Sequence, residues 1–215
     1  MKVFLLQAKS LFYKSIITAV LLAVYSVMHA TEYYWQPTTG STAWATASAW
    51  NTEPDGSGTS AIPQAGDTVY FNNGGTSTVT FVNGSTNNVG SIIVSDNTTV
   101  TFQNASGTTN AVLNITTTTG VGLFVEEGSS LLVLHSSGTN RPMSVVIQNA
   151  GLTSEIAGTV TLNLGTTHNL REVLVTGTLN VGGATVTMPN AIIEGTLNMS
   201  SGAITIANVT VNGTL

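Results

Sequence analysis

The end of the chain repeats a short motif at a fixed interval. The letters GTLN occur at residues 177–180 and again at 195–198, and GTL occurs at 213–215. The glycines that open the motif are Gly177, Gly195 and Gly213, so the step between them is constant. A repeat this short forms a small structural unit that cannot bury its own apolar side chains, so neighbouring repeats must stack on one another.

Within each repeat the apolar residues fall two positions apart. In the first full repeat they are Leu179 and Val181, Val186 and Met188, and Ala191 and Ile193. This alternation is typical of strands with one buried face, and the Gly, Ser, Asn and Pro residues in the gaps are typical of turns. The pattern predicts an all-β fold, a parallel β-helix (solenoid) with three short strands in each of its coils of roughly 18–22 residues. A sandwich of hairpins is the alternative, but it does not require a fixed interval.

Stacked coils place equivalent residues of successive repeats in columns. We therefore expect Leu197 to be buried between Leu179 and Leu215, and Thr205 to lie on the outer face. Asn190 is expected to lie over Asn208 at a corner, where the two amides can form a ladder.

The pattern continues towards the N-terminus with less regularity. The step from Gly158 to Gly177 is one residue longer than the C-terminal step. Gly128 is expected to have the same role as Gly158, but it lies much further before it along the chain. The excess is expected to leave the coil as a loop near residues 135–142. Strands are also expected on both sides of a turn at Asp96 and Asn97. The spacing predicts about seven coils within residues 75–215.

Residues 1–30 predict a signal peptide. Three lysines precede or flank the start of an apolar run at residues 16–27, which is too short to cross a bilayer comfortably as a helix. Cleavage is expected after Ala30, with Ser26 as the alternative site. A retained membrane anchor is the competing interpretation.

Removal of this segment leaves a chain with few charges. It has no lysine and two arginines against ten acidic residues, a net charge of −8. There is no basic patch for nucleic acid or for anionic lipid, so no nucleic-acid partner is expected. The polarity comes from Thr, Ser and Asn, and the absence of cysteine means that no disulfide can hold the domain together.

Residues 31–74 carry most of the large aromatic side chains. All three tryptophans, Trp35, Trp44 and Trp50, lie here, close to Tyr33 and Tyr34. We interpret this segment as an aromatic cap and loop, because the first coil of a solenoid otherwise exposes open core and unpaired strand edges. The alternative is that the three tryptophans bind a ligand as a platform for sugar rings.

The same segment resembles the start of autotransporter-associated β-strand repeat proteins. The resemblance rests on the tryptophan-rich opening, on the later GTL coils, and on Pro63, Gly66, Asp67, Val69 and Phe71 of a P-x-x-G-D-x-V-x-F pattern. It implies a right-handed β-helix exported through the periplasm of a Gram-negative bacterium to the cell surface or beyond. Such passengers often precede a C-terminal β-barrel, which this sequence lacks. We therefore expect an N-terminal piece of a longer protein, in contact with a membrane only through a missing barrel or anchor.

No catalytic, metal or cofactor site is expected. Glu126 and Glu127 are adjacent, so on a strand they would point to opposite faces. His135 and His168 have no nearby nucleophile or carboxylate motif, and we expect both to be polar surface residues. The one polar cluster expected at a corner consists of His168, Arg171 and Glu172.

These observations favour a non-enzymatic function. We expect a structural stalk or an adhesive surface, with a glycan or a host or cell-surface molecule as a possible ligand. A glycan-binding or polysaccharide-degrading β-helix is the alternative. Self-association through the exposed C-terminal coil is also expected, because the strand at its end has no charge and no proline.

Overall fold

The computed structural model describes residues 30–105, 107–134, 142–163 and 166–215. The predicted signal peptide and most of the predicted loop at 135–142 lie outside the described residues. Thr31–Leu215 forms one compact unit. Within the described part this unit is all-β, with eighteen strands and one short 3-10 helix at Ala47–Ala49. No helix in this part of the chain is long and apolar enough to cross a membrane.

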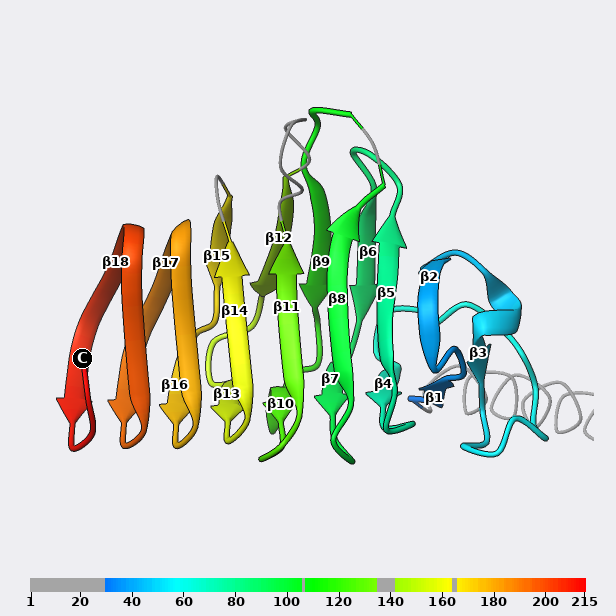
Figure 1. The fold of residues 1–215 in the computed structure, drawn as a ribbon, viewed down its shortest axis with the longest axis horizontal. Helices are drawn as coiled ribbons and strands as arrows, with labels where there is room; N and C mark the ends of the chain where they lie inside the picture. Colours follow the sequence, from blue (N-terminus) through cyan, green and yellow to red (C-terminus); the bar gives the residue numbers. More distant parts are fainter. Residues whose placement is uncertain (1–29, 106, 135–141, 164–165) are drawn as a thin grey trace, which may run out of the picture. The chain divides into compact units, whose positions relative to one another are not determined.

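The strands form a parallel β-helix with three faces, as the repeat predicts (Figure 1). Face 1 contains β1 (Glu32–Trp35), β4 (Thr68–Phe71), β7 (Ser91–Val94), β10 (Val121–Val125), β13 (Thr153–Ile156) and β16 (Glu172–Val175). Face 2 contains β2 (Thr39–Ala43), β5 (Thr76–Phe81), β8 (Thr99–Asn104), β11 (Ser130–Leu134) and β14 (Thr159–Asn163). Face 3 contains β6 (Thr86–Val89), β9 (Ala111–Ile115), β12 (Met143–Ile147) and β15 (Thr167–Asn169). The long strands β17 (Thr178–Ile193) and β18 (Thr196–Val211) each pass through all three faces.

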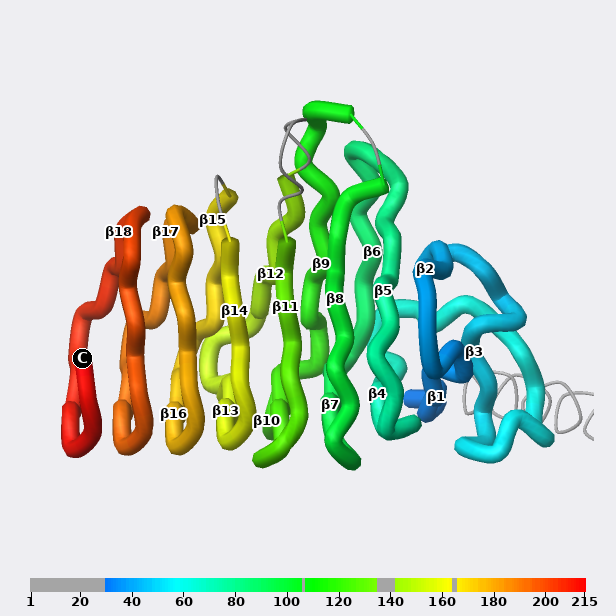
Figure 2. Tube along the Cα trace, viewed as in Figure 1, coloured from blue at the N-terminus to red at the C-terminus, as the bar shows by residue number. Residues whose placement is uncertain are grey.

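Successive coils follow one another along the chain, as the tube in Figure 2 shows. The register joins Glu172 to Asn190 and Asn190 to Asn208, so the last coils repeat with a constant step of 18. Earlier coils are longer, since Thr68 pairs with Ser91 and Ile92 pairs with Leu123. The expected coil length therefore describes the C-terminal coils, and longer connections enlarge the others.

Parallel pairing begins before residue 75. Strand β1 pairs in parallel with β4, and β2 pairs in parallel with β5, so residues 31–74 already contribute strands to faces 1 and 2. The short β3 (Trp50–Asn51) pairs antiparallel with β1. From residue 75 onward the described part of face 2 contains six strands, and a bridge from Thr196 to Thr214 begins a further turn of the chain.

The glycine of each GTL motif lies directly against the backbone of the preceding coil. A Cβ atom on Gly177, Gly195 or Gly213 would collide with backbone carbonyl oxygens of the preceding coil, and Gly158 is confined in the same way. The register places Gly158 opposite Ser129, so the expectation that Gly128 has this role is wrong. Gly128 instead occupies the turn before β11, with a φ of 82°.

The core is built from the predicted columns. Leu179 is fully buried, and Leu197 lies on it in register with 6% of its surface exposed. Leu215 is itself exposed, although Leu197 N–H donates to the carbonyl of Thr214. In the last coil Met199, Val209 and Val211 are exposed, because no further strand covers their side of the core in the described part of the chain.

Candidate functional site

The three tryptophans lie inside the N-terminal end of the core. Trp35, Trp44 and Trp50 are each no more than 2% exposed. The indole N–H of Trp35 donates to Ser77 Oγ at 3.0 Å, and that of Trp50 donates to the carbonyl of Trp44 at 2.9 Å. Their ring faces are covered, so the interpretation of these residues as an exposed sugar platform is wrong.

Aromatic contacts connect the tryptophans to the first coils. The ring of Trp50 packs edge-on against both Trp35 and Trp44, with centroids 4.8 Å apart in each case. Trp44 stacks on Phe81 at 5.1 Å, and Phe81 in turn meets Phe102 at 5.5 Å. The large buried aromatic rings therefore lie between residues 35 and 102, and the apolar core beyond residue 102 is aliphatic.

His168 is buried, so the expectation of a polar surface residue is wrong. It occupies the inward position of β15, between Val145 of β12 and Val186 of β17. Nδ1 accepts the backbone N–H of Val145 at 3.1 Å, which leaves the proton on Nε2. Thr166 Oγ1 lies 3.0 Å from Nε2 and donates its own proton to the carbonyl of Met143. Burial lowers the pKa of His168 to about 4, and the ring is neutral.

The predicted corner cluster of His168, Arg171 and Glu172 does not form. Arg171 has a φ of 59°, and its guanidinium donates to the carbonyls of Ile147 and Gln148 in the preceding coil. Glu172 accepts hydrogen bonds from Asn190 Nδ2 at 2.7 and 2.8 Å. The three side chains have different surroundings: His168 lies in the core, Arg171 contacts the backbone of the preceding coil, and Glu172 contacts the following coil.

A continuous row of hydroxyl groups runs along the outside of face 2. Inward residues such as Val79 and Val100 are buried, so their neighbours along each strand point outward. The register aligns Thr39, Thr76, Thr99, Ser130, Thr159, Thr178, Thr196 and Thr214. All eight are partly or fully exposed, and the spacing of neighbouring strands repeats the hydroxyl every ~4.8 Å.

A second outward row on face 2 ends in amides. Asn198 Nδ2 donates to Asn180 Oδ1 at 2.9 Å, and Asn180 Nδ2 donates to Thr161 Oγ1 at 3.2 Å. The predicted amide ladder between Asn190 and Asn208 is also confirmed, since Asn208 Nδ2 donates to Asn190 Oδ1 at 2.8 Å. These bonds fix side chains that would otherwise move freely on the surface.

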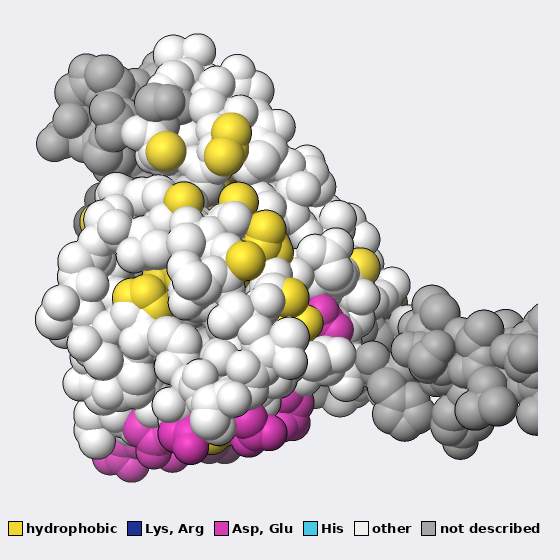
Figure 3. Space-filling model, turned by 90° about the vertical axis from the view of Figure 1, so that its right-hand side faces the viewer, with side chains coloured by type: hydrophobic (Ala, Val, Ile, Leu, Met, Phe, Trp, Pro, Cys, Tyr) yellow, Lys and Arg dark blue, Asp and Glu magenta, His cyan; other side chains and the backbone are white. Residues whose placement is uncertain are grey.

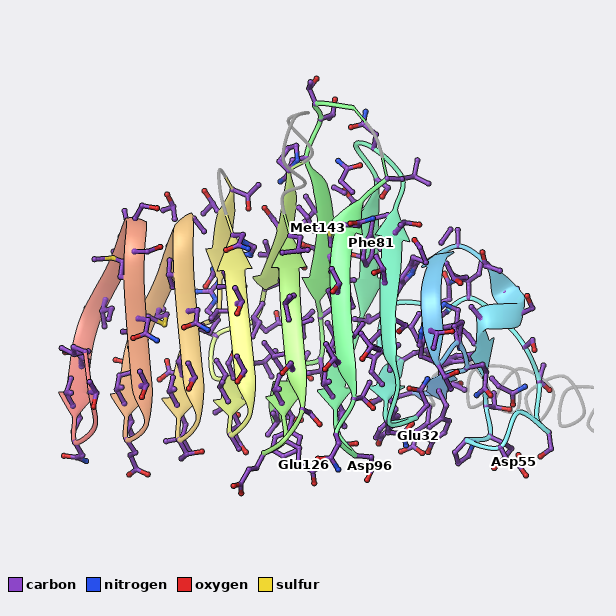
Figure 4. The ribbon with its side chains drawn as sticks, in the orientation of Figure 1. Glu32, Asp55, Phe81, Asp96, Glu126 and Met143 are labelled. Carbon is purple, nitrogen blue, oxygen red and sulfur yellow. The ribbon has the colours of Figure 1, made fainter. Side chains whose placement is uncertain are left out.

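Acidic side chains gather along one edge of the unit. Figure 3 shows them at the bottom of the end view, and Figure 4 places Asp96 and Glu126 on that edge. It is the corner where face 1 passes into face 2, and Asp96 N–H donates to Glu126 Oε2 at 2.7 Å. Asp96 and Asn97 have φ values of 56° and 57°, which confirms the predicted turn. No group of three or more acidic or His side chains suited to a metal ion occurs among the described residues.

The period-two pattern identified the outward residues but could not show which of them meet. The hydroxyl row spans connections of unequal length, and its early members share no common spacing with the repeat of the C-terminal coils. The recurrence of Thr at the start of each strand is the signal that could have revealed it.

Comparison with protein-family models, curated proteins and solved structures finds no match for this chain.

Proposed function

We propose that this chain is an exported, surface-displayed β-solenoid that acts as a structural stalk or adhesive surface and not as an enzyme. The observation that carries the proposal is the hydroxyl row of face 2, from Thr39 to Thr214. An uncharged array of donors and acceptors repeated at every coil suits many weak contacts with an extended partner. Such contacts add up by multivalency without a deep pocket.

Export and display are supported by the sequence. The basic and apolar character of residues 1–30 is that of a signal peptide. The tryptophan-rich opening and the pattern from Pro63 to Phe71 resemble autotransporter-associated β-strand repeat proteins. In the structure Asp67 of this pattern ties the start of the solenoid together, because its carboxylate accepts the N–H groups of Thr31 and Gln64. We propose on these grounds that the protein acts at the surface of a Gram-negative cell or in its surroundings.

The test is adhesion of bacteria that display the chain. The variant Thr99→Val/Thr159→Val/Thr178→Val removes three hydroxyls from face 2 and keeps β-branched side chains suited to strands. We expect at least a threefold loss of adhering cells, with unchanged surface labelling. The matched control is Thr167→Val/Thr185→Val/Thr187→Val on face 3, which is expected to adhere like the wild type. Equal adhesion of all three, or release of sugar fragments from a polysaccharide by the purified chain, contradicts the proposal.

A further inference from the structure

An apolar row runs along the outside of face 1. Val69, Ile92 and Val173 of this face point inward and are buried, so the residues that follow each of them point outward. The register aligns Tyr34, Tyr70, Ile93, Phe124, Glu155, Leu174, Ile192 and Thr210. Six of these eight outward positions are aromatic or aliphatic, and none is buried. The outward rows of face 2 consist mainly of hydroxyl and amide side chains, so the outer surface of face 1 is more apolar than that of face 2.

A polar row accompanies the apolar one along the C-terminal coils. It consists of Thr153, Glu172, Asn190 and Asn208, which are in register and lie two residues earlier on each strand. Two residues of a strand separate the rows by ~7 Å. The hydrogen bonds from Asn208 to Asn190 and from Asn190 to Glu172 fix these side chains in place. Asn208 Oδ1 has no partner among the described residues and is free to accept a hydrogen bond.

The two rows line a groove of about 450 Å³. Leu174 and Ile192 supply apolar surface, and Glu155 and Asn190 supply acceptors and donors. This volume lies within the range of small-molecule sites, which combine apolar walls with a few fixed polar groups. The groove crosses four coils, a length of ~14 Å, and it is open at the surface.

The row is also ordered at its N-terminal end. The rings of Tyr34 and Tyr70 stack with centroids 4.9 Å apart and an interplanar angle of 15°. Both hydroxyls donate to Glu32, one to each carboxylate oxygen, at 3.0 Å. Figure 4 shows Glu32 beside β4 on this side of the unit. The two rings are therefore held in one orientation, which reduces the entropy lost when a ligand contacts them.

We infer that face 1 binds an extended neutral polysaccharide whose chain runs along the coil axis. A pyranose ring has an apolar C–H face, which matches the apolar row, and hydroxyl groups at its edge, which match the polar row. Glu155 and Glu172 lie in the groove and no Lys or Arg lines it among the described residues, so uronic-acid polymers are repelled. The inference deepens the adhesive function proposed above and rests on it for its biological meaning.

The experiment is affinity electrophoresis of the full-length chain in gels that contain a neutral polymer. Hydroxyethyl cellulose, xyloglucan and dextran are the neutral probes, and alginate is the uronic-acid probe. We expect at least one neutral polymer to retard the wild type and alginate to leave its mobility unchanged. The double variant Leu174→Thr/Ile192→Thr keeps side chains suited to strands and is expected to bind at least tenfold more weakly.

The matched control is Leu132→Thr, which makes the same kind of change in an outward row of face 2. It is expected to bind within twofold of the wild type, and circular dichroism of all variants checks that the fold is kept. Retardation by none of the neutral polymers, retardation by alginate, or equal loss in the Leu132 variant overturns the inference. Loss of adhesion in the face 2 hydroxyl variant with intact polysaccharide binding supports both proposals. Normal adhesion of that variant contradicts the adhesive role of the hydroxyl row but not the binding of polysaccharide by face 1.

Discussion

The Nδ1 atom of His168 accepts the backbone N–H of Val145 at 3.1 Å, so a side chain takes the place of a backbone carbonyl between two coils. Strands β12 and β15 share one registered pair in the described part of the chain, Val146 with Asn169. A buried N–H without an acceptor destabilises a fold by about 1–3 kcal/mol. The imidazole therefore completes the ladder where β15 is too short to do so.

This arrangement predicts an acid-sensitive core. In the folded state His168 has a pKa of about 4 and is neutral at any higher pH. In the unfolded chain the imidazole takes up its proton near the ordinary pKa of 6.5. The stabilising contribution is complete above pH 6.5 and is lost as the pH falls towards 4, by on the order of 3 kcal/mol. The residues in contact or in register with the ring, Val145, Thr166 and Val186, carry no charge.

Urea unfolding at pH 7 and pH 4.5 measures the effect. His168→Gln keeps a side-chain acceptor but does not titrate, so we expect lower stability at pH 7 and a smaller loss on acidification than in the wild type. An identical pH dependence in both proteins contradicts the assignment, because the carboxylates are common to both.

Substitution of the repeated glycine is expected to separate two coils. Gly195→Ala places a methyl group against the carbonyl oxygen of Gly177, and the backbone must shift to accommodate it. We expect a loss of about 1–3 kcal/mol in the free energy of unfolding, measured by chemical denaturation. Thr196→Ala, at the next position, removes a partly exposed side chain and is expected to change stability by less than about 0.5 kcal/mol. Equal effects at both positions would show that the close approach is not limiting.

The column that contains Leu197 distinguishes the inner and outer surfaces of the coil. Leu197→Asp places a carboxylate between coils, where Leu197 is 6% exposed, and is expected to destabilise by about 3 kcal/mol or more. Thr205→Asp lies on the exposed side of β18 and is expected to be tolerated. Thermal unfolding followed by circular dichroism compares the two variants, and similar midpoints would contradict the assignment of faces.

The last coil is expected to be the least protected part of the solenoid. Strand β18 pairs with β17 on one side, while its other side carries the bridge from Thr196 to Thr214 and exposes Met199 and Val209. We expect fast amide exchange from about Ser200 onward and slow exchange within residues 160–190. The free edge is also expected to drive concentration-dependent association, measured by analytical ultracentrifugation. Uniform protection up to Leu215 in a monodisperse monomer contradicts this prediction.

The sequence alone determined how a coil is built. Apolar residues two apart required strands with one buried face, and the constant step of the repeat required Leu179 to lie on Leu197 and Asn190 on Asn208. These predictions held because each of the last coils, from Gly177 onward, lies on a coil of the same length, so the alignment of two repeats in the sequence is also their alignment in space.

Tertiary structure decided everything that depends on coils of unequal length. The long steps from Glu32 to Thr68 and from Ile92 to Leu123 cannot be aligned by spacing, yet they bring Tyr34 over Tyr70 and Ile93 beside Phe124. Only the structure also shows that His168 is buried, although its polar side chain suggested a place on the surface. The rings of the three tryptophans likewise point into the core. The alternation of apolar residues in the sequence predicts only that neighbouring residues of a strand point to opposite faces. Only the hydrogen-bonded register between coils decides which residue lies on which, because the connections between strands absorb any number of residues without disturbing the ladder.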